Sequence, residues 1–170
     1  MKNNNKNKKK NYHIKHNAGN VPANNAFFNI GTGMMEDMQE PVNVKEIIKE
    51  IATPELVEFI NQHAVEINGN RFNLIYQELP AHLVSKFTEL MLFSGIKPLT
   101  YMRTVPALYL ANSEHVPYVI IGDNIQVIGA NAFMSSEIKT IDIGLGVKKI
   151  FFRAFAHMRG EPSIRYAGTY

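Results

Sequence analysis

The chain has 170 residues, of which 45% are hydrophobic and 19% charged, and its formal net charge is +3. This length and composition suit one domain with a packed core and exclude a chain that is disordered throughout. Because cysteine is absent, disulfide scaffolds, thiolate metal sites and cysteine nucleophiles are excluded, and no apolar run approaches the roughly 18–20 residues needed to cross a bilayer.

Residues 1–40 are expected to form an extended arm rich in asparagine and lysine. Residues 1–20 carry a charge of +6, whereas residues 36–66 carry a charge of −6. Three interpretations of the arm remain open: a solubilising segment, a segment that docks on an acidic protein surface such as residues 36–66 of a neighbouring copy, and a segment that neutralises nucleic-acid phosphates. The lysines concerned are Lys2, Lys6, Lys8, Lys9, Lys10 and Lys15.

Residues 41–100 are expected to be mainly helical. Asn43, with Glu46 at the third position after it, forms an asparagine version of the capping box and predicts the start of a helix. Thr53, followed by Pro54, predicts the start of a second helix. A third helix is expected after Pro80. The residues expected to face the core are Ile47, Ile48 and Ile51 in the first helix, Leu56, Phe59 and Ile60 in the second, and Leu83, Phe87, Leu90 and Met91 in the third, which should end at Gly95.

A tight β-hairpin is expected between the second and third helices. Asn68-Gly69 is a typical turn pair for a short hairpin loop. Apolar residues on its two sides stand at alternate positions, at Val65, Ile67, Phe72, Leu74 and Tyr76. This alternation is the pattern of half-buried strands.

From residue 101 the helical periodicity gives way to a repeated unit. The sequence IGANAF at positions 128–133 returns as IFFRAF at positions 150–155. A weaker copy precedes both, where Val105 matches Ile128 and Leu110 matches Phe133. Positions 164–166 fall where positions 141–143 would recur. A period of this length is typical of solenoids, in which neighbouring units stack on a shared core.

The repeat resembles the leucine-rich repeats of BspA-like bacterial surface antigens. In that family each unit has a short strand, an Ile or Val, a turn that contains glycine, and an Ala-Phe pair that fills the core. The matching residues, within about 105–170, are Ile125, Ile128, Gly129, Ala132, Phe133, Ile138, Ile141, Ile143, Val147, Ile150, Ala154 and Phe155. The resemblance implies an α+β protein in which helical residues 41–100 cap a short leucine-rich-repeat, β-solenoid-like array at residues 101–170.

The last repeat departs from the family pattern in its turn. Phe151 and Phe152 stand where the preceding unit has Gly129 and Ala130. Aromatic side chains bordered by cations are common at the centre of protein interfaces. The candidate protein-binding residues are therefore Phe151, Phe152, Arg153, Lys148, Lys149 and Arg159. The alternative is that the two phenylalanines close the open end of the solenoid.

The sequence does not support catalysis or metal binding. Gly31-Thr32-Gly33 lacks the third glycine of a phosphate loop and follows no predicted strand. His13 and His16 have no second ligand pair or carboxylate cluster beside them, as a metal site would require. The other histidines, His63, His82, His115 and His157, lie singly in the sequence. We expect no enzyme, no metal and no cofactor.

These observations favour a non-enzymatic protein that binds other proteins or takes part in an assembly. BspA-like repeats occur on bacterial surfaces, in protozoa and in phage-encoded proteins, so a virion component is one form of this hypothesis and a surface adhesin is another. Asparagines follow the basic N-terminus where a signal peptide would be apolar, so the cytoplasm or a viral particle is the expected location and no membrane partner is expected. The alternative class is a nucleic-acid-binding protein that uses the lysine-rich arm.

Overall fold

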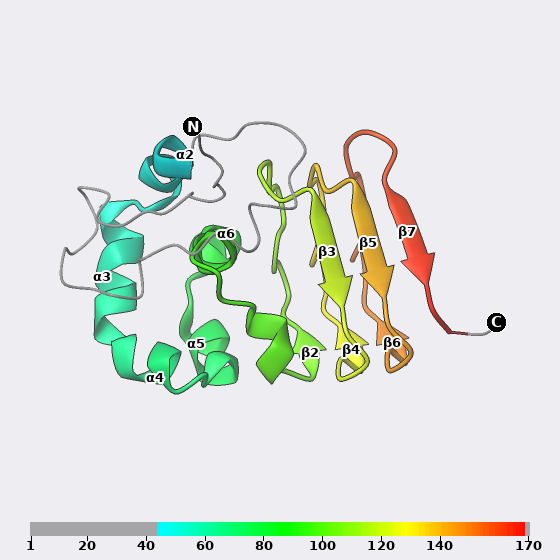
Figure 1. Ribbon diagram of the computed structural model, residues 1–170, viewed down its shortest axis with the longest axis horizontal. Helices are drawn as coiled ribbons and strands as arrows, with labels where there is room; N and C mark the ends of the chain where they lie inside the picture. The colour runs from blue at the N-terminus through cyan, green and yellow to red at the C-terminus, as the bar shows by residue number, and fades with distance from the viewer. Residues whose placement is uncertain (1–43, 169–170) are drawn as a thin grey trace, which may run out of the picture.

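The computed structural model describes residues 44–168 (Figure 1). It shows a mixed α/β protein with helices in its N-terminal half and two small parallel sheets in its C-terminal half. The two halves lie along the long axis, with the helices at one end and the last strand at the other (Figure 1). The expected arm at residues 1–40 and the capping residue Asn43 lie outside the described residues.

The helical half contains short helices joined by tight turns. In chain order these are α2 (Val44–Ile51), α3 (Pro54–Gln62), α4 (Ala64–Asn68), α5 (Phe72–Glu78), the 3-10 turn η2 (Ala81–Leu83), α6 (Val84–Phe93) and the 3-10 turn η3 (Pro98–Tyr101). The three helices expected from the capping and periodicity signals are confirmed as α2, α3 and α6. Thr53 accepts a hydrogen bond from the Leu56 amide at 3.4 Å at the start of α3, and Gly95 takes a φ of 84° just after α6.

Helix α6 is the central helix of this half (Figure 1). Its buried residues lie on every side of the helix: Val84, Phe87, Thr88, Glu89, Leu90, Met91 and Phe93. A helix that is buried on every side belongs inside a core. Its buried threonine is satisfied, because Thr88 Oγ1 donates to the Val84 carbonyl at 3.0 Å and lies 2.6 Å from the Tyr76 hydroxyl.

The expected hairpin around Asn68-Gly69 is wrong, because the chain there forms helices α4 and α5. The buried residues Phe72, Ile75 and Tyr76 recur at the spacing of one helix face. The alternating pattern predicted that Leu74 faces the core, whereas Leu74 is 38% exposed. Asn68-Gly69 belongs instead to the turn between two helices, and the left-handed residue of that turn is Asn70, with a φ of 62°. Asn68-Gly69 does mark a turn, but the turn connects two short helices instead of two strands.

The C-terminal half has two three-stranded parallel sheets. One contains β2 (Thr104–Val105), β4 (Val127–Ile128) and β6 (Lys149–Ile150), and the other contains β3 (Tyr118–Ile121), β5 (Thr140–Ile143) and β7 (Ser163–Tyr166). Paired residues along both sheets are 22 or 23 positions apart, as in the row formed by Val105, Ile128 and Ile150. The sequence period is therefore also the spatial period of the strands.

The turns between the strands repeat as closely as the strands do. Leu108, Asn131 and Arg153 occupy equivalent positions of successive units, and all have a positive φ, between 57° and 66°. A second set, Asn112, Ser135 and His157, repeats at the same spacing with φ between 56° and 63°. Non-glycine residues adopt this conformation infrequently. Its recurrence at equivalent positions shows that each unit has the same backbone path.

A row of aromatic rings joins the helical half to the repeated units. The Tyr76 ring lies 5.9 Å from the Tyr109 ring, and Tyr109 meets Phe133 edge-on at 6.2 Å. Phe133, which is completely buried, stacks on Phe155 at 5.6 Å with an interplanar angle of 11°. Phe133 and Phe155 therefore occupy equivalent positions of neighbouring units with their rings stacked, although Phe155 is only half-buried.

Candidate functional site

The far end of the repeated half presents apolar and basic side chains to solvent. In the described part of the chain, no strand pairs with the outer edges of β6 and β7, which form the end of the molecule opposite the helices (Figure 1). The large apolar residues exposed there include Ile150, Phe151, Phe152 and Ile164. We call this region, together with its neighbouring cations, the C-terminal surface.

The structure brings most of the predicted binding residues together on this surface. Lys149 Nζ lies 4.6 Å from the centre of the Phe151 ring, and the Arg153 guanidinium lies 5.0 Å from the centre of the Phe152 ring. Lys148 is exposed beside them in sequence. Cation–π contacts of this kind hold a charge against an aromatic face and leave both groups accessible.

Arg159 differs from the other predicted residues because its side chain is engaged with the preceding unit. Its Nη1 lies 3.0 Å from Glu137 Oε2, and its Nε donates a hydrogen bond to the Ser135 carbonyl at 3.0 Å. The Glu114 carboxylate lies 3.8 Å from the same Nη1. These contacts anchor the guanidinium, so Arg159 is less available to a partner than Lys149 or Arg153.

A second exposed row crosses the outer face of β3, β5 and β7. The Tyr118 hydroxyl donates to Asp142 Oδ2 at 2.5 Å, and Arg165 donates to both Asp142 oxygens at 2.5 and 2.8 Å. The hydrogen bonds from Arg165 lower the pKa of Asp142. The bond to Asp142 raises the pKa of Tyr118. Exposed ion pairs add little stability, so the main effect of this row is to fix the surface beside Ile120.

Sequence reasoning missed this row as a candidate site. The register pairs Ile120 with Asp142 and Asp142 with Arg165. The opposite charges of Asp142 and Arg165 at one repeat position were a usable signal, because equivalent positions of stacked parallel units lie side by side.

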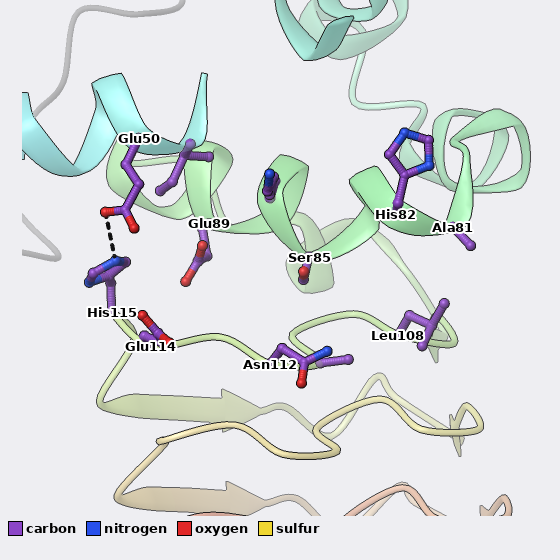
Figure 2. A pocket seen from close by; sticks show the side chains of 12 residues that line it. Glu50, Ala81, His82, Ser85, Glu89, Leu108, Asn112, Glu114 and His115 are labelled. Atoms are coloured by element: carbon purple, nitrogen blue, oxygen red, sulfur yellow. Dashed lines mark ion pairs between the residues drawn. The ribbon is translucent and has the colours of Figure 1, made fainter. Parts of the chain in front are cut away.

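A cleft separates the helices from the first repeated unit, which runs from β2 to β3 (Figure 2). Its volume is about 410 Å³. One end is formed by Glu50 from α2, Glu89 from α6, and Glu114 and His115 from the loop before β3, all drawn together in Figure 2. Its other end is lined by Ala81, His82 and Leu108.

Glu89 is the buried acid of this cleft, with only 6% of its surface exposed. Ser113 Oγ donates to Glu89 Oε2 at 2.5 Å. Burial raises the pKa of the Glu89 carboxyl, and the Ser113 hydrogen bond and His115 partly oppose this effect. Ser113 directly follows Asn112, one of the left-handed turn residues of the repeated units. Its contact with Glu89 therefore joins α6 to the first repeated unit.

His115 is not alone in the structure, although it is alone in the sequence. Its Nε2 lies 3.4 Å from Glu50 Oε1, the ion pair drawn as a dashed line in Figure 2. The donor atoms of Glu50, Glu114 and His115 all lie within 4.8 Å of one another. Glu50 reaches this place from α2, so only tertiary structure could reveal the group.

Two other histidines form direct pairs with glutamates of the helical half. His63 Nε2 lies 2.8 Å from Glu78 Oε1, and His82 Nε2 lies 2.9 Å from Glu55 Oε1. The hydrogen bond to Glu78 raises the pKa of His63, whereas burial acts in the opposite direction. These pairs connect neighbouring helices.

The predicted arm residues cannot be placed among these surfaces. Lys2, Lys6, Lys8, Lys9, Lys10 and Lys15, together with His13 and His16, lie outside the described residues. Within residues 44–168, no helix has the length and apolar character required to cross a bilayer.

Comparison of the chain with protein-family models, with curated proteins and with solved structures found no significant match. The resemblance to BspA-like repeats therefore stays a prediction from the residues of the repeat.

Proposed function

We propose that this protein is a non-enzymatic interaction protein. In this proposal, residues 101–170 form a short leucine-rich-repeat solenoid of the BspA-like type, and the helices at residues 41–100 cap its first unit. The parallel pairing of strands at the sequence period and the stacked Phe133 and Phe155 rings support the solenoid. The contact between Tyr76 and Tyr109 supports the capping role of the helices, because a terminal unit needs its apolar face covered.

The observation that carries the proposed function is the exposed aromatic pair of the C-terminal surface. Phe152 is 70% exposed and Phe151 is 43% exposed. Side chains that close a core would be buried, as Phe133 is. An aromatic group left in water beside a cation favours an interface, because aromatic residues and arginine supply much of the binding energy where proteins meet.

The chemistry of this surface favours an acidic protein partner with an apolar contact region. Lys148, Lys149 and Arg153 provide positive charge around the two phenylalanines. The outer edges of β6 and β7 also offer backbone groups to which an extended segment of a partner can add as a further strand. The same surface would suit attachment to neighbouring subunits of an assembly such as a virion.

Affinity capture from the native source tests this function. Phe151→Ser/Phe152→Ser should lose a partner that the unchanged chain retains, while its free energy of unfolding changes by less than about 1 kcal/mol. Val65→Ser is the matched control, because Val65 is an apolar residue with 82% exposure at the helical end. A double variant that keeps the partner would contradict the interface. A large loss of stability would instead assign the two phenylalanines to closing the core.

The charge of +6 on residues 1–20 supports a second function, binding of nucleic acid through the arm. Such binding should lack sequence preference and weaken steeply with salt. An electrophoretic shift with and without residues 1–20 tests it. A shift that is lost on truncation supports this function, and the absence of a shift from the full chain at low salt rejects it.

A further inference from the structure

The cleft between the helices and the first repeated unit holds a set of side chains typical of a metal centre. Glu50, Glu114 and His115 offer two carboxylates and one imidazole, and their donor atoms lie within 4.8 Å of one another. The ligands come from α2 and from a loop much later in the chain. Glu50 and Glu114 are exposed, so their side chains can turn toward a shared ion without disturbing the core.

The spacing of His115 and Glu50 distinguishes this group from the other histidine–glutamate pairs. His63–Glu78 and His82–Glu55 are in hydrogen-bond contact at 2.8 and 2.9 Å. His115 Nε2 and Glu50 Oε1 are 3.4 Å apart. Bonds of about 2.0–2.2 Å from zinc to nitrogen and oxygen, at tetrahedral angles, place two ligand atoms roughly 3.3–3.6 Å apart. This one pair is thus spaced as two ligands of one ion would be, and the exposed Glu114, within 4.8 Å of both, would have to turn toward the same ion.

The charges around the group favour a divalent cation. The buried carboxylate of Glu89 lines the same cleft as the three donors (Figure 2). Among residues 44–168, the cations close to the group include Lys86, which also lines the cleft, and Arg159, whose Nη1 lies 3.8 Å from Glu114 and 3.0 Å from Glu137. Arg159 is therefore shared between two carboxylates and compensates for only part of the negative charge.

The donor set also indicates which class of ion fits. Calcium and magnesium prefer oxygen ligands, whereas an imidazole nitrogen suits zinc and other first-row transition metals. We propose that Glu50, Glu114 and His115 bind a divalent transition-metal ion of the zinc class, which joins α2 to the first repeated unit. Solvent would complete the coordination of the ion, with Glu89 beside it.

This site predicts that zinc stabilises the full-length protein with one ion per chain at neutral pH. A ligand that binds only the folded state raises the midpoint of thermal unfolding. Titration calorimetry with zinc chloride should give a stoichiometry of one, and hydrogen exchange should slow in residues 44–51 and 112–116. Magnesium chloride at the same concentration should change neither readout.

Matched variants assign the ion to this cleft. His115→Ala and Glu50→Gln should each remove the thermal shift and the calorimetric signal. His82→Ala should retain both, because His82 pairs with Glu55 at 2.9 Å and lines the other end of the same cleft. Glu50→Gln keeps the test valid if His115→Ala does not fold, because Glu50 is an exposed side chain.

Two results would overturn the proposal. One is a chain whose unfolding midpoint and heat signal do not respond to zinc. The other is a zinc response that survives both Glu50→Gln and His115→Ala but disappears in His13→Ala/His16→Ala, which would place the ion on the arm.

Discussion

Truncation of Phe133 to alanine tests the shared interior of the repeated units. Phe133 is completely buried, and its ring contacts Tyr109 on one side at 6.2 Å and Phe155 on the other at 5.6 Å. The change removes a ring that two neighbouring units share. It also leaves a cavity that the rigid stack around it can fill only in part.

The expected losses follow the burial of each ring. Phe133→Ala should lower the free energy of unfolding by about 3–5 kcal/mol, the usual cost for a buried phenylalanine. Phe155 has a ring neighbour on one side and is half-buried, so Phe155→Ala should cost roughly half as much, about 2 kcal/mol. Phe152 is 70% exposed, so Phe152→Ala should cost at most about 0.5 kcal/mol.

Urea unfolding, followed by circular dichroism, measures these three losses under one set of conditions. The order Phe133, Phe155, Phe152, from largest to smallest, is the expected result. Phe133→Leu is the control, because it keeps most of the apolar volume and should cost less than Phe133→Ala. A loss below about 1 kcal/mol for Phe133→Ala, or a larger loss for Phe155→Ala, would refute the packing argument.

Two further predictions concern the close approach of the turns and the dependence of stability on pH. A Cβ atom added at Gly146 would lie 2.0 Å from the Asp123 carbonyl oxygen, so Gly146→Ala should destabilise by about 1–3 kcal/mol in urea unfolding; unchanged stability would contradict this contact. Because Glu78 raises the pKa of His63, the pair should contribute its full stability below the unfolded pKa of about 6.5 and lose it as pH rises through the raised value. Glu78→Gln should flatten this part of the pH profile of unfolding; an unchanged profile would exclude the pair as its cause.

The repeated half could be predicted from the sequence because the spacing of its strands equals the spacing of the repeated apolar residues along the chain. Each short unit must place an apolar residue at the same point of the shared interior, so the buried pair Val105 and Ile128, or the rings of Phe133 and Phe155, recur at the interval at which their strands pair or their rings stack. The left-handed backbone conformation of the turns could not be predicted from the residue types in the same way. Asn131 and Arg153 share a positive φ although their side chains have little in common.

The helical half could be predicted only where local chemistry decides the structure. The Thr53 cap and the glycine after α6 are local signals, and both operate in the structure. The segment from Val65 to Tyr76 has apolar residues compatible with two periods, and contact with α6 selects the helical one, since Tyr76 meets Phe87 and Thr88. Tertiary packing therefore overrides the alternating pattern.

The candidate sites differ in how far apart their residues lie along the sequence. The C-terminal surface was visible in the sequence, because Lys149, Phe151, Phe152 and Arg153 are near neighbours along the chain. The group of Glu50, Glu114 and His115 is not apparent in the sequence, because Glu50 lies on α2, which packs on α6, and meets His115 only in the folded chain. A histidine judged by its sequence neighbours alone is taken as isolated even when a distant helix supplies its partner.

Nuclear Overhauser contacts between equivalent residues of successive units test directly whether these units stack on one another. Contacts should link Ile128 with Ile150 and Ile141 with Ile164, the pairs that face each other in the two parallel sheets. The Phe133 and Phe155 rings should also show contacts with each other. Contacts that instead join Ile128 or Phe133 to unrelated segments, with none between equivalent positions of neighbouring units, would contradict the stack and remove the C-terminal surface on which the proposed function rests.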